Sequence, residues 1–257
     1  MRKIGLICLL LMVSGILFSQ KWKLTRYELM YGVGVSNYFG DIGSTSNNNN
    51  LYGIKDIRIF NTRPSFMVGA RYKIKQKFHT RVAFSFIMLN GDDSRGSYPQ
   101  RNYSFNTFGL EQSGQVEYAL LSEDRNRTSF AVYNKRGIMY SRSRLGLYAF
   151  AGVGGLFYIP FIDHSNPDPS YTFKGDHFSS GPSYTGIAFG GIMLKTIYSN
   201  YLALSLEFGP RFVIGDDLDG LTSKFSKFND MYYYLNFSVI YRIKTSRKGY
   251  PMLFKRY

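Results

Sequence analysis

The stretch Met231–Ile243 reads MYYYLNFSVIYRI, and its pattern decides the fold. The even-numbered positions include Asn236, Ser238 and Arg242, whereas the odd-numbered positions are all apolar or aromatic: Met231, Tyr233, Leu235, Phe237, Val239, Tyr241 and Ile243. A period of two residues predicts an extended strand with one apolar and one mixed face. Aromatic residues at both ends of about ten alternating residues also match a tilted strand that crosses a bilayer. A half-buried strand of a soluble sandwich has the same period, so the rest of the chain has to distinguish the two.

The same alternation recurs along the chain and predicts an all-β fold. The eight expected strands span residues 27–39, 64–74, 80–90, 103–121, 145–159, 184–197, 201–214 and 231–243. Gly91-Asp92-Asp93 is expected to end the third strand and Pro160 the fifth. The connections alternate between long and short, except for a connection of medium length at 122–144, part of which (129–133) could be a short extra strand or an extension of its neighbour. Short turns on one side and longer loops on the other are typical of an up-and-down barrel in an outer membrane, with both termini on the periplasmic side.

The polar faces of these strands separate a membrane barrel from a soluble one. Besides glycine and serine, they carry Arg71, Lys73, Glu111, Glu117, Glu207 and Arg211. A soluble lipocalin-like barrel also has eight strands, but its apolar face points inward. Charged residues instead suit the narrow interior of a membrane barrel of this size, which side chains fill and where opposite charges pair. The sequence therefore predicts an eight-stranded antiparallel transmembrane β-barrel over residues 21–243, with no open pore.

Residues 1–20 are typical of a secretory signal peptide. Arg2 and Lys3 precede an apolar core, Ile4–Phe18, and a small-residue exit at Ser19-Gln20. The only cysteine, Cys8, lies in this segment, so we expect neither disulfides nor thiolate chemistry in the mature chain. Later stretches lack the roughly 18 uninterrupted apolar residues of a spanning helix, so insertion into a membrane after export requires strands.

The formal net charge of +15 is concentrated on the expected periplasmic side. An export signal argues against nucleic acid, the partner that such a charge otherwise suggests. The bases gather in the connection 122–144 and in the basic tail 244–257; they are Arg125, Arg127, Lys135, Arg136, Arg142, Arg144, Arg247, Lys248, Lys255 and Arg256. Rim residues such as Lys77 and Arg81 join them, opposed by Glu28. We expect the ten bases to dock an acidic partner, the alternative being that rim bases only reach anionic lipid headgroups.

Two loop clusters allow a chemical interpretation beside a structural one. Asp216, Asp217 and Asp219 offer oxygen ligands that suit calcium, but a polar turn uses the same residues, and no glutamate follows at the EF-hand position. Asp163, His164 and His177 share an outer loop and provide the groups that a hydrolase needs, but histidines in a polar loop are commonly only solvated. We therefore expect no metal, no cofactor and no enzymatic activity.

Six short stretches carry a resemblance to a known family. They are Ser36–Asp41 (SNYFGD), Arg63-Pro64, Gly91-Asp92-Asp93, Arg101–Phe105 (RNYSF), Phe150–Gly154 (FAGVG) and Asp216–Gly220 (DDLDG). In this order and spacing, the chain resembles a family of small Bacteroidetes outer-membrane barrels that includes the PorG component of the type IX secretion system. The resemblance covers nearly the whole mature chain, although the connection 122–144 is longer than the family usually shows. It implies a non-enzymatic barrel associated with the periplasmic ring of that machine.

The sequence thus leads to three hypotheses about function. The first is an outer-membrane barrel, surrounded by lipid, that anchors or docks the periplasmic ring proteins of a type IX secretion system. The second is a stand-alone surface barrel whose outer loops bind a ligand or lipopolysaccharide. The third is a lipid or peptide hydrolase that uses the loop with His164 and His177.

Overall fold

A computed structural model describes thirteen segments of the chain. They are residues 25–40, 42–43, 61–95, 100, 102–121, 130–134, 137–141, 145–163, 177–199, 201–215, 217–222, 229–246 and 250–252. The expected signal peptide, residues 1–20, lies outside them. Within these segments the secondary structure is β, apart from a short 3-10 helix, η4 (Asp93–Arg95). The described residues contain no helix with the length and apolar character needed to cross a membrane.

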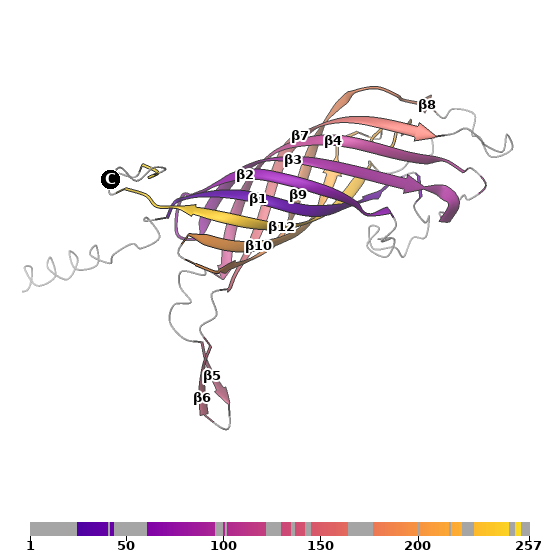
Figure 1. Cartoon of the computed structure of the whole chain (residues 1–257). Helices are drawn as coiled ribbons and strands as arrows, with labels where there is room; N and C mark the ends of the chain where they lie inside the picture. Colours follow the sequence, from indigo (N-terminus) through magenta and orange to yellow (C-terminus); the bar gives the residue numbers. More distant parts are fainter. Residues whose placement is uncertain are drawn as a thin grey trace, which may run out of the picture.

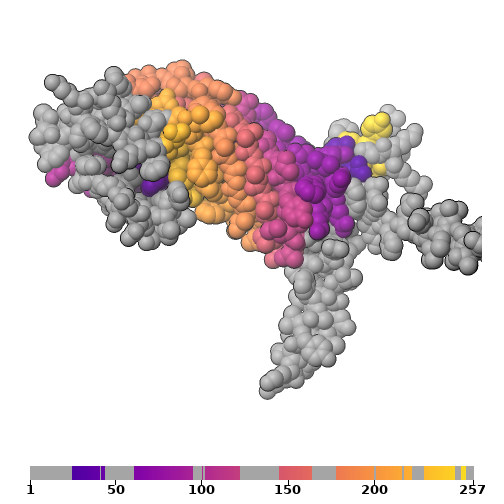
Figure 2. Space-filling model, turned by 180° about the vertical axis from the view of Figure 1, so that it is seen from behind, coloured from indigo at the N-terminus to yellow at the C-terminus, as the bar shows by residue number. Residues whose placement is uncertain are grey.

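Eight long antiparallel strands close into a barrel (Figure 1). They are β1 (Tyr27–Phe39), β2 (Arg63–Lys73), β3 (Phe78–Asp92), β4 (Ser104–Leu121), β7 (Leu145–Asp163), β9 (Ser183–Ile197), β10 (Leu202–Val213) and β12 (Met231–Ile243). Each strand pairs with the next long strand along the chain, and β1 pairs with β12 from Tyr27↔Ile243 to Phe39↔Met231 to complete the ring. In a space-filling view the strands form a continuous wall (Figure 2). The predicted eight-stranded up-and-down barrel is confirmed.

The two ends of the barrel differ in their connections. One end, here called the inner end, holds the start of β1, the end of β12 and the short turns 74–77 and 198–201. The connection 122–144 between β4 and β7 lies at this end as well and is as long as the connection 40–62 at the opposite end. The opposite end, here called the outer end, holds the longer connections 40–62, 93–103, 164–182 and 214–230. Because short turns are typical of the periplasmic side of outer-membrane barrels, we expect the inner end to face the periplasm.

Side chains alternate between the two surfaces of the wall as the sequence predicts. The outward-facing side chains are apolar and exposed, for example Val33, Val68, Phe84, Leu206 and Phe237. Most of the intervening side chains are buried; some are apolar, and the polar ones include all six charged residues of the predicted polar faces. An exposed apolar exterior around an interior that buries charged side chains, in a closed barrel, is the arrangement of strands that cross a bilayer. The protein is therefore a membrane-spanning β-barrel of the outer-membrane type.

Two predicted strand ends are wrong because pairing overrides local sequence signals. Strand β3 runs through Gly91 to Asp92, since its pairing with β4 continues to Asp92↔Ser104. Strand β7 runs through Pro160 to Asp163, because Pro160 still pairs with Thr107 of β4. The pairing of β7 with β9 ends at Tyr158↔Ser183. Pro160 therefore lies where β7 has an open edge, and a residue without an N–H is tolerated at such an edge.

The described residues also form four short strands outside the barrel. Strand β8 (His177–Phe178) pairs with β11 (Leu221–Thr222), which joins two outer connections. Strand β5 (Phe130–Asn134) pairs with β6 (Gly137–Ser141) as a hairpin between β4 and β7. Of the two alternatives for residues 129–133, the structure supports a short extra strand, because 130–133 belong to a separate hairpin; residue 129 lies outside the described residues.

Candidate functional site

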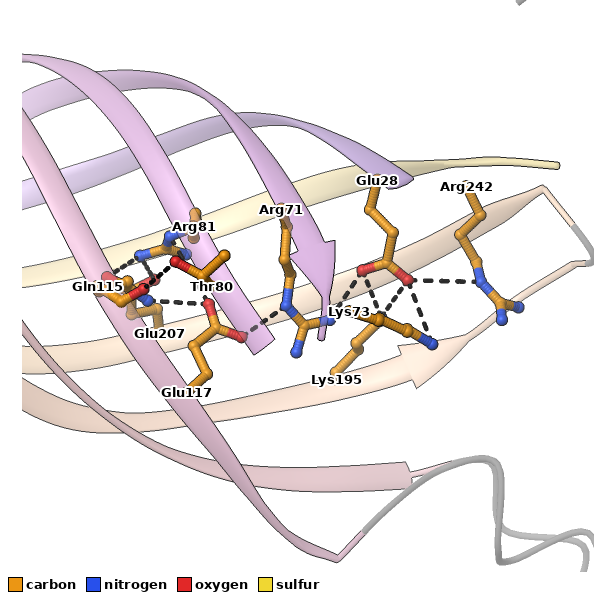
Figure 3. A network of polar contacts seen from close by, with 10 residues as sticks. All are labelled: Glu28, Arg71, Lys73, Thr80, Arg81, Gln115, Glu117, Lys195, Glu207 and Arg242. Carbon is orange, nitrogen blue, oxygen red and sulfur yellow. Dashed lines mark hydrogen bonds and ion pairs between the residues drawn. The ribbon is translucent and has the colours of Figure 1, made fainter. Parts of the chain in front are cut away.

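The inner half of the barrel interior is held together by a network of charges around Glu28 (Figure 3). The Glu28 carboxylate contacts Arg71 Nη1 at 2.7 Å and Lys195 Nζ at 2.8 Å. Lys73 Nζ and Arg242 Nε each lie 3.7 Å from the same carboxylate. These residues come from strands β1, β2, β9 and β12, so a single carboxylate links strands on opposite sides of the lumen.

The network continues from Glu28 toward the middle of the barrel. Arg71 Nε contacts Glu117 at 2.5 Å, and Gln115 Nε2 donates to the other oxygen of Glu117 at 2.9 Å. Arg81 Nη2 lies 2.6 Å from Glu207, which also contacts Arg211 at 3.3 Å. The network ends at Glu111, which accepts hydrogen bonds from Arg211 and Tyr232; like the other charged members, these groups are buried.

This network confirms that the interior is filled by paired charges, and it corrects the expected docking surface. The sequence predicts Arg81 and Glu28 at the inner rim, but both side chains are buried inside the barrel, where they contact other barrel residues. They contribute to the stability of the lumen rather than to a surface field. The alternation along β1 could have revealed the position of Glu28, because it shares the inward face with Gly32 and Gly34.

A cluster of apolar and aromatic side chains fills much of the outer half of the interior. Its core includes Ile87, Phe105, Leu156, Ile187 and Val213 from the strands. Leu218 and Leu221, which follow β10 in sequence, are fully buried in the same cluster. Residues 217–222 therefore fold over the outer mouth of the barrel; we refer to them as the outer cap.

Hydrogen bonds fix the outer cap to β1, to β4 and to Asp230, the residue before β12. Tyr38 Oη lies 2.8 Å from Asp219 Oδ2 and 2.6 Å from Asp230 Oδ1. Asp230 Oδ2 accepts from the backbone N–H of Leu218 at 2.9 Å. Thr107 Oγ1 donates to the backbone carbonyl of Leu218 at 2.7 Å. Because a hydroxyl carries one hydrogen, Tyr38 donates to one carboxylate at a time, and it bridges the cap to the start of β12.

The inner rim carries aromatic rings on its outer surface, with two lysines above them. Tyr27 and Tyr72 pair with ring centroids 5.0 Å apart, and Phe78 and Tyr118 do the same at 5.0 Å. Lys77 Nζ lies 5.7 Å from the centre of the Tyr118 ring, and Lys244 Nζ lies 5.1 Å from that of Tyr201. Aromatic rings and lysines at this level are typical of a membrane–water interface. For these two lysines, the geometry favours contact with lipid headgroups.

The described part of the basic tail turns back on itself beyond the inner end of β12 (Figure 1). Thr245 and Pro251 form an antiparallel bridge, and the N–H of Met252 donates to the carbonyl of Lys244 at 2.8 Å. The N–H of Arg26 donates to Thr245 Oγ1 at 3.1 Å, which ties the tail to the start of the first strand. Tyr250 and Met252 are 69% and 54% exposed, so the tail presents apolar side chains at the inner end.

The ten basic residues expected to dock a partner lie outside the described residues. These are Arg125, Arg127, Lys135, Arg136, Arg142, Arg144, Arg247, Lys248, Lys255 and Arg256. The first six flank the strands of the β5–β6 hairpin or lie in its loop, and the last four flank the turned-back part of the tail.

The structure describes four of the six loop residues considered for chemistry, namely Asp163, His177, Asp217 and Asp219. The backbone of His177 pairs with Thr222 in the β8–β11 ladder, and Asp163 is the last residue of β7. His164 and Asp216 lie outside the described residues. Asp217 accepts a hydrogen bond from Tyr158 at 2.5 Å, and Asp219 accepts one from the N–H of Leu221. Among the described residues, no group of three or more His, Cys, Asp or Glu side chains is arranged to hold a metal ion.

Comparison with known proteins adds a likeness of fold. No protein-family model matches the chain, and no curated protein matches it. Similar solved structures are Neisserial surface protein A, Ail (the attachment invasion locus protein of Yersinia pestis) and a major outer membrane protein from Thermus thermophilus. Their identities are 10%, 8% and 12%, each with a TM-score of 0.42. The matches cover 84%, 85% and 84% of this chain and 96%, 99% and 99% of those chains. The assignment as a membrane barrel rests on the topology and surface of the barrel itself.

Proposed function

We propose that the protein is a non-enzymatic outer-membrane anchor that docks the periplasmic ring of a type IX secretion system at its inner end. The observation that carries the proposal is the contrast between the two ends. At the outer end, the outer cap packs over the mouth of the barrel. At the inner end, a hydrogen bond fixes the tail to the barrel, and the side chains of Tyr250 and Met252 are exposed to solvent. The identity of the secretion system comes from the family resemblance of the sequence.

Charge supports the same end as the working surface. The connection 122–144 carries six bases and two acids, Glu123 and Asp124, and the tail 244–257 carries five lysines and arginines and no acid. A basic surface speeds and orients the encounter with an acidic protein surface. The interior of the described barrel is filled by paired charges and by apolar side chains.

The test is co-purification of ring proteins with tagged barrel variants from cells. In the first variant Arg247, Lys248, Lys255 and Arg256 are changed to Glu. In the matched control, four bases of the outer connections, Lys55, Arg58, Lys224 and Lys227, are changed to Glu, so the net charge falls by the same amount. We expect the tail variant to insert normally, lose the ring proteins and reduce secretion, and the control to retain both. Equal recovery of the ring proteins by both variants would contradict the proposal.

A further inference from the structure

The β5–β6 hairpin has two edges that no other described strand covers. Its register runs from Phe130↔Ser141 to Asn134↔Gly137, and among the described strands β5 and β6 pair only with each other. The hairpin belongs to the inner end, because it connects the end of β4 to the start of β7. A two-stranded hairpin is only marginally stable by itself, and a third strand is a common way to stabilise it.

The register identifies the backbone groups that face the two edges. Two loop residues separate Asn134 from Gly137, and residues that flank a two-residue loop form a hydrogen-bonded pair. Hydrogen-bonded and non-hydrogen-bonded pairs alternate along antiparallel strands. The pairs Tyr133↔Ile138 and Ala131↔Tyr140 are therefore of the non-hydrogen-bonded kind. Their N–H and C=O groups point away from the hairpin, Ala131 and Tyr133 on the β5 edge, Ile138 and Tyr140 on the β6 edge.

Neither strand carries the residues that usually protect an exposed edge. Proteins block open edges with charged side chains, prolines or bulges, because an uncovered edge pairs with other chains. The strands read FAVYN and GIMYS, without a charge or a proline, and their register is continuous. The tail differs, since its bridge contains Pro251. The bases of this connection stand outside the two strands, in the loop and in the flanking segments.

We propose that one edge of the β5–β6 hairpin binds an extended acidic segment of a periplasmic protein by strand addition. This inference rests on the proposed function and specifies how the docking occurs. Backbone hydrogen bonds to the edge would supply affinity, as in other cases of strand addition. The excess of four positive charges, from six bases and two acids in residues 122–144, selects an acidic partner segment over a basic one.

Single proline substitutions at a cross-strand pair test the edges separately. Ala131→Pro removes an outward N–H on the β5 edge, and Tyr140→Pro removes one on the β6 edge, while neither removes a hydrogen bond within the hairpin. Ala131→Gly keeps the N–H and serves as the control. Each variant is expressed as the full chain, its barrel is checked by heat-modifiable gel migration, and ring proteins recovered with it are quantified.

We expect one of the two proline variants to recover at least ten-fold less partner, and Ala131→Gly to recover as much as the wild type. If both proline variants recover wild-type amounts, strand addition is excluded while the proposed function stands. If the wild type recovers no ring protein, the proposed function fails.

Photo-crosslinking in intact cells tests strand addition independently of the co-purification experiment. For this measurement a photoreactive phenylalanine derivative replaces Tyr133 in one sample and Tyr140 in another. An adduct with an acidic segment of a periplasmic protein, identified from the crosslinked peptide, supports strand addition. An adduct with a second copy of this chain, or none at either position, overturns it.

Discussion

Different interactions dominate the filling of the inner and outer halves of the lumen. In the inner half, Glu28 contacts four bases, and its neighbours form a chain of ion pairs that ends at Glu111. In the outer half, buried apolar side chains of the strands pack against Leu218 and Leu221 of the outer cap. The same eight strands surround both halves, although near the outer end of β12 both faces of the strand are buried, so the main difference lies in the filling. A charged filling depends on specific partners, whereas an apolar filling depends on volume and shape.

The largest effect is expected from removing the carboxylate at the centre of the charged half. Glu28→Gln leaves Arg71, Lys73, Lys195 and Arg242 without the charge that they contact in common. Breaking a buried ion pair from one side costs about 3–5 kcal/mol, because the remaining charge stays buried. The free energy of unfolding, measured by reversible denaturation in lipid vesicles, should fall by about this amount.

A second substitution separates charge imbalance from lost packing. Adding Lys195→Met to Glu28→Gln removes one of the positive charges that lost its contact with Glu28, so part of the lost stability should return. A Glu28→Gln variant as stable as the wild type would contradict the account of the inner half.

The exterior provides the next largest effect and a contrast with the interior. Leu235→Arg places a charge on the lipid-facing side of β12 near its middle, where Leu235 is exposed. An arginine at the bilayer midplane costs a membrane barrel about 2–4 kcal/mol, and near the interface only about 0–1 kcal/mol. Tyr241→Arg on the same strand, at the inner rim, is the matched control. Equal losses of unfolding free energy for the two variants would show that this face does not lie against lipid.

A smaller effect is expected at the junction of the outer cap. Tyr38→Phe removes the hydroxyl that contacts Asp219 and Asp230. Loss of a partner for a buried polar group costs about 1–3 kcal/mol. Amide hydrogen exchange of Leu218 and Leu221 should become faster in the variant. The control Tyr31→Phe, on the exposed face of the same strand, should change neither the free energy of unfolding nor these exchange rates. An unchanged exchange rate in Tyr38→Phe would show that the Tyr38 hydroxyl does not hold the outer cap in place.

The sequence predicts the wall of this barrel better than its filling. Strands β1 and β12 have the predicted bounds, since a period of two residues is a local property that each strand displays. The contacts of Glu28 with Lys195 and Arg242 depend on the stagger of strands that are far apart in the chain, which periodicity does not contain. The same limit applies to the contact of Tyr38 in β1 with Asp219 and Asp230, which both lie in the outer connection 214–230.

The start of β12 shows a second limit. Alternation predicts that Met231 and Tyr233 face lipid, but both are buried, and the Tyr233 ring stacks on Phe208 with centroids 5.9 Å apart. Near the outer end both faces of the strand are buried, so the period of the sequence no longer reports exposure. A third limit concerns the residues expected to dock a partner. Net charge suggests an acidic partner, but it does not specify the geometry of the contact.

The central claim, an apolar exterior in lipid around a closed lumen, is tested most directly by two neighbouring side chains of β12. Val239 is 40% exposed on the outer surface, whereas Ile240 is 0% exposed inside the barrel. The measurement is the relaxation enhancement of their methyl signals by a lipid with a spin label on its acyl chain, in nanodiscs. The account predicts strong broadening of the Val239 methyls and little change for Ile240. Broadening of Ile240 without Val239 would contradict it, because the apolar face would then point away from the bilayer.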